Sequence, residues 1–208
     1  MPDTERSQLN RVAEWIGVPI GEGQFTALKK YASWLASEAI QAGGLGPDEG
    51  PRIWDRHVCD SLAFAVGFRN EGPDMALDVG SGVGLPGIPL AILWPRTSWT
   101  LLDRSRGRTN LARRAVRVLG LGNVTAIQAE IDQHRHVYDG IVARGVMEPA
   151  ILARKSTPLL SSGGKLVIGL SRTINEAREV PAGSLLQRIP PEVLDGGAEI
   201  LIIEPRER

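Results

Sequence analysis

The chain has 208 residues, of which 42% are hydrophobic, and its 24 basic and 24 acidic side chains give a net charge of zero. This length is typical of one α/β domain with a short extension, and the neutral balance is not that of a strongly basic nucleic-acid binder. The apolar runs are too short to span a bilayer, and the first residues lack the pattern of a signal peptide. The single cysteine, Cys59, excludes an internal disulfide, and with the three histidines it shows no ligand spacing. We therefore expect a cytoplasmic protein without a metal.

The first third of the chain is predicted to be helical. Apolar residues recur at helical spacing within residues 3–16, 24–42 and 53–68. The Gly- and Pro-rich residues 43–51 indicate a flexible connector before the third helix. On that helix His57 and Asp60 lie three residues apart on one face, where an ion pair is one interpretation. A hydrolase is disfavoured, because no serine stands in a nucleophile-elbow motif.

A glycine-rich loop follows the first apolar run of the second part, in Asp-Val-Gly-Ser-Gly-Val-Gly-Leu-Pro-Gly-Ile (78–88). The pattern predicts a strand, a tight turn and a helix, with glycines that let the backbone approach a ligand. Leu85 stands where a dinucleotide-binding loop has its third glycine, and the Gly-Lys-Ser/Thr of a Walker loop is absent. The spacing resembles motif I of the class I S-adenosylmethionine (SAM) methyltransferases. The predicted cofactor contacts of the loop are Asp78, Gly80, Ser81, Gly82, Gly84 and Leu85.

A second apolar run ends at Asp103, 23 residues after Gly80. A strand-end carboxylate about 20 residues beyond such a loop can accept hydrogen bonds from both ribose hydroxyls, although it could instead cap the next helix. The following segment carries six arginines and no acid, and these either bind RNA phosphates or form a solvated helix face. They are Arg104, Arg106, Arg108, Arg113, Arg114 and Arg117.

From residue 75 onward strands and helices alternate, which predicts a mostly parallel sheet covered on both faces. The expected strands are 75–80, 98–103, 123–128, 139–144, 164–170, 186–190 and 199–204, and the expected helices are 85–94, 106–119 and 148–160, with 173–180 uncertain. The last two strands fit a hairpin in which one strand is antiparallel to the rest. We expect a helical extension in residues 1–74 and one compact domain in residues 75–208, with ligands beyond the strand carboxyl ends.

Four segments share the order and approximate spacing of one protein family. They are Arg-His-Val-Cys-Asp-Ser-Leu (56–62), the loop with its Leu-Pro-Gly-Ile ending, Leu-Leu-Asp (101–103) followed by Leu-Gly-Leu-Gly-Asn-Val (119–124), and Tyr-Asp-Gly-Ile-Val-Ala-Arg (138–144). In these segments the sequence resembles the RsmG (GidB) methyltransferases of bacterial small-subunit rRNA. The resemblance is best over residues 50–170.

The resemblance implies the Rossmann-like fold of class I SAM methyltransferases and methyl transfer to N7 of a guanine in 16S rRNA. It implies that Ile131 and Asp132 border the adenine of SAM and that Arg144 contacts the cofactor or the substrate. Arg56, His57 and Arg144 are expected to position the substrate, because guanine N7 carries no proton that a general base must remove. Arg144 could alternatively be a structural partner of a carboxylate. The expected partner is 16S rRNA or the small ribosomal subunit, bound by a monomer.

Two features of the family pattern are missing. Residues 38–44 replace the family's Asn-Leu-Thr motif, and Gly169-Leu170 replaces a Lys-Gly pair after the fifth strand. A SAM methyltransferase with another RNA or a small molecule as acceptor therefore stays an alternative. So does a non-catalytic RNA-binding or assembly protein, although the intact glycine loop disfavours it. A nicotinamide-dependent oxidoreductase is disfavoured by Leu85.

Overall fold

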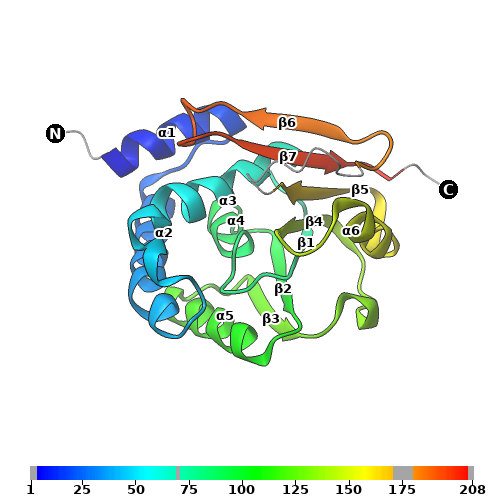
Figure 1. Cartoon of the computed structure of the whole chain (residues 1–208), viewed down its shortest axis with the longest axis horizontal. Helices are drawn as coiled ribbons and strands as arrows, with labels where there is room; N and C mark the ends of the chain where they lie inside the picture. Colours follow the sequence, from blue (N-terminus) through cyan, green and yellow to red (C-terminus); the bar gives the residue numbers. More distant parts are fainter. Residues whose placement is uncertain (1–3, 69–70, 171–179, 206–208) are drawn as a thin grey trace.

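A seven-stranded sheet forms the centre of the protein, seen here in a computed structural model that describes residues 4–68, 71–170 and 180–205 (Figure 1). Its strand order is β3-β2-β1-β4-β5-β7-β6. The strands are β1 (Met75–Val79), β2 (Ser98–Asp103), β3 (Val124–Gln128), β4 (Tyr138–Arg144), β5 (Leu160–Gly169), β6 (Leu185–Ile189) and β7 (Ala198–Ile203). β1 to β5 pair in parallel, whereas β7 pairs antiparallel with both β5 and β6. The predicted sheet with an antiparallel last strand is confirmed.

Helices cover both faces of the sheet, but unequally. The α-helices are α1 (Thr4–Ile16), α2 (Glu22–Trp34), α3 (Asp60–Leu62), α4 (Gly87–Leu93), α5 (Arg106–Leu119) and α6 (Pro149–Ser156). Figure 1 shows α2, α3, α4 and α5 on one side of the sheet and α6 on the other. The core on the α2 side joins residues of the N-terminal helices, such as Leu28, to sheet residues such as Val142. The core under α6 contains Leu152 and Ile141. Since the first core is shared, the division at residues 74 and 75 stays a prediction.

The segment between α2 and β1 differs most from the sequence prediction. α2 continues into a π-helical turn, η1 (Leu35–Ala39), and the predicted flexible connector contains a 3₁₀-helix, η2 (Pro47–Arg52). Pro47 is the first residue of η2. Proline is tolerated there, because the N–H group that it lacks would have no acceptor within the helix. The predicted helix 53–68 consists of a π-helix, η3 (Ile53–Cys59), the short α3, and a 3₁₀-helix, η4 (Ala63–Gly67). π-turns in helices are frequent at functional sites, and η3 carries two predicted site residues.

The remaining differences are small. β5 begins at Leu160, four residues before the prediction, because the preceding helix ends at Ser156 and continues only as the 3₁₀-helix η6 (Thr157–Leu159). The uncertain segment 173–180 lies outside the described residues except for its last position. Within the described ranges, no helix combines the length and the apolar character that crossing a membrane requires.

Candidate active site

The glycine loop joins β1 to α4 and has a backbone that favours glycine at three positions. Gly80, Gly82 and Gly84 have φ angles of 68°, 61° and 106°, a region that other L-residues rarely adopt. The alternate glycines are therefore required by the turn itself. A Cβ on Gly82 would meet no atom within 4 Å, so the space above this residue is open to a ligand.

Asp78 connects the end of β1 to the start of α4 and so stabilises the loop between them. Its side chain is fully buried, and Oδ2 accepts a hydrogen bond from the N–H group of Gly87 at 2.8 Å, at the start of α4. Burial raises the pKa of Asp78 to about 8, although the Gly87 hydrogen bond and the charge of Arg144 lower it. Oδ1 of Asp78 and the hydroxyl of Ser81 are buried without a hydrogen-bond partner among the described residues. The structure thus gives Asp78 a supporting role, and its predicted contact with a cofactor stays a prediction.

The N-terminal segment contacts the glycine loop at Val83. The hydroxyl of Tyr31 in α2 donates to the carbonyl oxygen of Val83 at 3.0 Å, and both residues are buried. Gly44 approaches the same residue so closely that a Cβ there would lie 2.4 Å from Cγ1 of Val83. The loop conformation therefore depends on the segment before the sheet.

A cavity of about 390 Å³ and another of about 380 Å³ meet at the end of β4. The smaller is lined by Gly80, Asp103, Ile131 and Arg144, and by Arg104 and Arg108. We call it the cofactor cavity because the first four were predicted to contact SAM, and that contact stays a prediction. The larger, the acceptor cavity, is lined by Arg56, His57, Asp60 and Arg144, and also by Glu49, Gly169 and Leu170. Arg144 and Gly145 line both.

Asp103 ends β2 at the cofactor cavity and is held there by backbone groups. Its Oδ2 accepts from the N–H group of Gly82 at 3.0 Å, and its Oδ1 accepts from that of Ser105 at 2.8 Å. These bonds fix the plane of the carboxylate and leave a second lone pair on each oxygen. Asp103 therefore joins the glycine loop to the start of α5 while it faces the cavity.

Arg144 is fixed between the two cavities by three acceptors. Nη1 donates to the carbonyl oxygen of Arg56 and to Oδ2 of Asp60, each at 3.2 Å, and Nη2 donates to Nδ1 of His57 at 3.3 Å. Arg144 is thus the partner of a carboxylate, as the alternative interpretation held, and it also lines both cavities. The sequence allowed an ion pair between His57 and Asp60, but the structure pairs each with another residue. Asp60 pairs with Arg144, and His57 pairs with Glu49.

The protonation state of His57 follows from its two neighbours. A guanidinium can only donate, so Nδ1 of His57 accepts from Arg144, and the ring proton lies on Nε2. Nε2 donates to Oε2 of Glu49 at 2.9 Å. Burial, followed by the positive charge of Arg144, lowers the pKa of His57 in spite of the Glu49 hydrogen bond. His57 is therefore neutral at pH 7 and holds one fixed tautomer.

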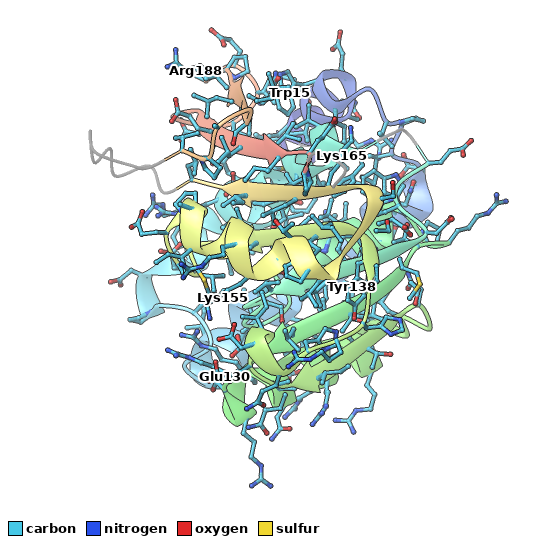
Figure 2. The ribbon with its side chains drawn as sticks, turned by 90° about the vertical axis from the view of Figure 1, so that its right-hand side faces the viewer. Trp15, Glu130, Tyr138, Lys155, Lys165 and Arg188 are labelled. Atoms are coloured by element: carbon cyan, nitrogen blue, oxygen red, sulfur yellow. The ribbon has the colours of Figure 1, made fainter. Side chains whose placement is uncertain are left out.

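Asp132 lies apart from the cofactor cavity. Its carboxylate pairs with Lys155 of α6, and it lines a third cavity of about 440 Å³ together with Arg135 and Arg154. Figure 2 looks onto this face, with α6 in front of the sheet and Lys155 on the side of α6 toward Glu130. Ile131 lines both this cavity and the cofactor cavity. The structure thus brings Ile131, and not the Asp132 side chain, to the other predicted cofactor residues.

The six arginines after β2 are all exposed, but they do not form one uniform surface. Arg104 and Arg108 line the cofactor cavity. Nε of Arg113 donates to the carbonyl oxygen of Ala126 at 3.0 Å, and Arg114 pairs with Glu38. Arg106 and Arg117 form no ion pair within the part of the chain that the structure describes.

Several lining residues were missed by sequence reasoning. Glu49 and the residues of the cofactor cavity after β4, Gly145, Val146 and Met147, carry no motif of their own. The last three directly follow a predicted strand, and that position was the available signal because ligands bind beyond the carboxyl ends of parallel strands. Nothing in the sequence placed Glu49 beside His57.

Solved structures share the fold. A putative O-methyltransferase from Klebsiella pneumoniae superposes with a TM-score of 0.57 at 11% identity, over 89% of this chain and 90% of that one. TrmN from Thermus thermophilus has a TM-score of 0.55 at 18% identity, over 74% of this chain and 53% of that one. These likenesses confirm the predicted class I methyltransferase fold.

The sequence matches curated relatives over most of its length. The family model GidB, described as rRNA small subunit methyltransferase G, matches residues 24–182. Ribosomal RNA small subunit methyltransferase G of Clavibacter michiganensis is 34% identical over 158 residues, which are 75% of this chain and 72% of that protein. The protein of the same name from Streptomyces avermitilis is 35% identical over 190 residues, 88% of this chain and 76% of that protein. The family, the enzyme class and the SAM dependence predicted from the sequence are confirmed: the chain belongs to the rRNA small subunit methyltransferase G family.

Proposed function

We propose that this protein transfers a methyl group from SAM to N7 of a guanine in 16S rRNA. The observation that carries the proposal is the pair of cavities that meet at Arg144 and Gly145. A methyl donor in one and a base in the other would face each other across the end of β4. Both cavities fall within the usual size range of small-molecule sites.

The residues of the cofactor cavity fit SAM. Asp103 offers a fixed carboxylate at a strand end, which suits the two ribose hydroxyls. Ile131 provides an apolar surface for the adenine. Gly82, whose N–H group donates to Asp103, has open space above it that suits the amino-acid end of SAM. When bound, SAM supplies an electrophilic methyl group on a sulfonium.

The acceptor cavity would act by positioning. Guanine N7 already carries a lone pair, so no residue has to remove a proton, and the rate depends on alignment and on exclusion of water. Arg144 presents a guanidinium whose direction is fixed by Arg56, Asp60 and His57. His57 keeps its proton on Nε2 toward Glu49, so its role is to orient Arg144. Arg56 lines the same cavity, where its charge acts on Glu49 and His57, and its guanidinium donates no hydrogen bond among the described residues.

The proposed partner is 16S rRNA, free or within the small subunit, bound by a monomer in the cytoplasm. Among the six arginines, the exposed Arg106 and Arg117 are those best suited to bind phosphates, because their neighbours Arg113 and Arg114 make bonds within the protein. Arg104 and Arg108 would bind phosphate or ribose beside the cofactor cavity.

The activity is tested by offering labelled SAM separately to 16S rRNA and to small subunits, both from cells that lack the gene. We expect label in 7-methylguanine, and a large loss with Arg144→Lys, since a lysine cannot reproduce the three fixed contacts. The Arg96→Lys variant is the matched control, because Arg96 is exposed before the start of β2, at the opposite end of the strand from Asp103, and lines neither cavity. No label in either substrate, despite measurable SAM binding, would refute the rRNA assignment.

A second acceptor is favoured by one observation. Gly169 and Leu170, which replace the family's Lys-Gly, line the acceptor cavity. The cavity therefore lacks a charge there that relatives carry, and a different RNA or a small molecule is the alternative acceptor. Transfer to total RNA from the same cells, with no transfer to the small subunit, would establish this alternative.

A further inference from the structure

We propose that Glu49 selects guanine in the acceptor cavity by accepting hydrogen bonds from N1–H and the 2-amino group of the base. The inference rests on the proposed function and deepens it, because it names the group that distinguishes the acceptor base. Glu49 belongs to η2, the segment that the sequence predicted to be a flexible connector.

One oxygen of Glu49 is fixed and the other is available. Oε2 accepts from Nε2 of His57 at 2.9 Å, which sets the direction of the carboxylate. No hydrogen bond to Oε1 is found among the residues that the structure describes, and the side chain is 26% exposed at the cavity. A carboxylate oxygen that is held at a cavity wall and lacks a donor is suited to accept from a ligand.

The carboxylate is also held in its ionised form. Burial raises the pKa of Glu49, but the hydrogen bond from His57 and the charges of Arg56 and Arg52 lower it below its usual value overall. Since Arg144 fixes the tautomer of His57, the imidazole can only donate to Glu49. Glu49 therefore presents acceptors alone to the cavity.

An acceptor-only group distinguishes guanine from the other RNA bases. Guanine has two adjacent donors, N1–H and the 2-amino group, on its Watson–Crick edge. Adenine and cytosine present an acceptor nitrogen at the corresponding position, and uracil presents a single donor between two acceptors, so each would bring lone pairs against the carboxylate. Arg56, in the same cavity, supplies donors that match O6, and N7 is left free for methylation.

The other acids of the cavity are less suited to this role. Asp60 is engaged by Nη1 of Arg144 at 3.2 Å. Glu199 pairs with Arg188 across the β6–β7 hairpin at 3.1 Å. Glu49 is thus the carboxylate that combines a fixed orientation with an available oxygen. Glu199 provides a matched control, because it lines the same cavity.

The test compares guanine with inosine, which keeps N7 and O6 but lacks the 2-amino group. The methylated position of 16S rRNA is mapped first, and ligated rRNAs then carry guanine or inosine there. With the wild-type protein we expect kcat/KM for inosine to be about 10- to 100-fold lower, the usual effect of losing a hydrogen bond to a charged group. With Glu49→Gln the ratio should shrink to about 2- to 5-fold, because a neutral amide accepts a weaker bond.

The outcomes separate this inference from the proposed function. Glu199→Gln should keep the wild-type ratio of guanine to inosine. If Glu49→Gln slows both substrates equally and leaves the ratio unchanged, Glu49 merely supports His57 and the inference is overturned. A wild-type protein that methylates inosine as fast as guanine overturns it as well, while leaving N7 methylation intact. No transfer to the guanine rRNA would instead overturn the proposed function itself.

Discussion

The hydroxyl of Tyr31 donates a hydrogen bond to the carbonyl oxygen of Val83 at 3.0 Å, and so joins helix α2 to the glycine loop. The two residues lie 52 positions apart in the chain and are both buried. The N-terminal helices therefore support the cofactor cavity directly. A substitution in α2 should therefore alter the affinity for SAM, even though the substituted residue does not contact SAM.

Tyr31→Phe removes this hydrogen bond and leaves the buried Val83 carbonyl with no other donor among the residues that the structure describes. We expect the free energy of unfolding to fall by ~1 kcal/mol and the Kd for SAM to rise about fivefold, because the loop is less well fixed. Urea denaturation and titration calorimetry measure the two effects. Tyr138→Phe is the matched control: this buried tyrosine loses a hydrogen bond of 2.8 Å with His134, under α6. Equal SAM affinity in both variants would show that the loop does not need α2.

The glycine loop can be tested with a pair of glycines in the same backbone conformation. Gly82 has a φ angle of 61° and Gly120, at the end of α5, has one of 70°, and a Cβ on either would meet no atom within 4 Å. Alanine at each should therefore destabilise the fold similarly, by ~1 kcal/mol. Gly82→Ala alone should weaken SAM binding, by at least about tenfold, since its Cβ occupies the ligand side of the loop. If calorimetry gives both variants wild-type affinity, the loop does not contact SAM.

The sequence carried enough information for the sheet and the cofactor half of the site. The apolar runs that lead to Asp78 and Asp103 mark β1, which ends one residue after Asp78, and β2, which ends at Asp103, so both strands and their carboxyl ends could be located. The positive φ angles in the loop explain why its glycines are alternate. These features are local, since each depends on residues that are neighbours in the chain.

The acceptor half could not be predicted in the same way. Glu49 meets His57 because η2 packs against the π-helical η3 that follows it, and the Gly/Pro-rich composition of residues 43–51 gave no sign of the helix η2. Asp132 follows a strand end, as the cofactor residues do, yet it pairs with Lys155 of α6. Such partners are set by tertiary packing, which spacing along one chain does not record.

The buried carboxyl of Asp78 predicts a specific pH dependence. Its pKa is raised from 3.8 to about 8, so the folded state binds the proton more tightly than the unfolded chain. The stability from this group is fully present below about pH 4 and is lost as the pH rises toward about 8. Asp78→Asn mimics the protonated side chain and should remove this loss. The wild-type free energy of unfolding should fall by at least ~1 kcal/mol more than that of the variant between about pH 5 and about pH 8. Calorimetric unfolding at several pH values measures it.

The control for this experiment is Asp132→Asn, which changes an exposed carboxylate on the opposite face. It should keep the loss of stability between about pH 5 and about pH 8, because Asp78 is unchanged in this variant. An Asp78→Asn profile that is parallel to the wild type would mean that Asp78 is ionised in the folded protein, with an unmodified pKa. SAM affinity should fall little in Asp78→Asn, because the amide oxygen can still accept from Gly87.

The exposed arginines of α5 predict a salt-dependent contribution to RNA binding. Arg106 and Arg117 are exposed and lack an ion pair among the described residues, so each can neutralise a phosphate. The double alanine variant should bind 16S rRNA more weakly and reduce the slope of log Kd against log salt concentration by about 1 to 2 units. Arg6 of α1 and Lys165 of β5 (Figure 2) form the control pair, since both already bind glutamates and neither lines the cofactor or the acceptor cavity. A slope that falls as much in the control pair as in α5 would show that total charge, and not this helix, determines RNA affinity.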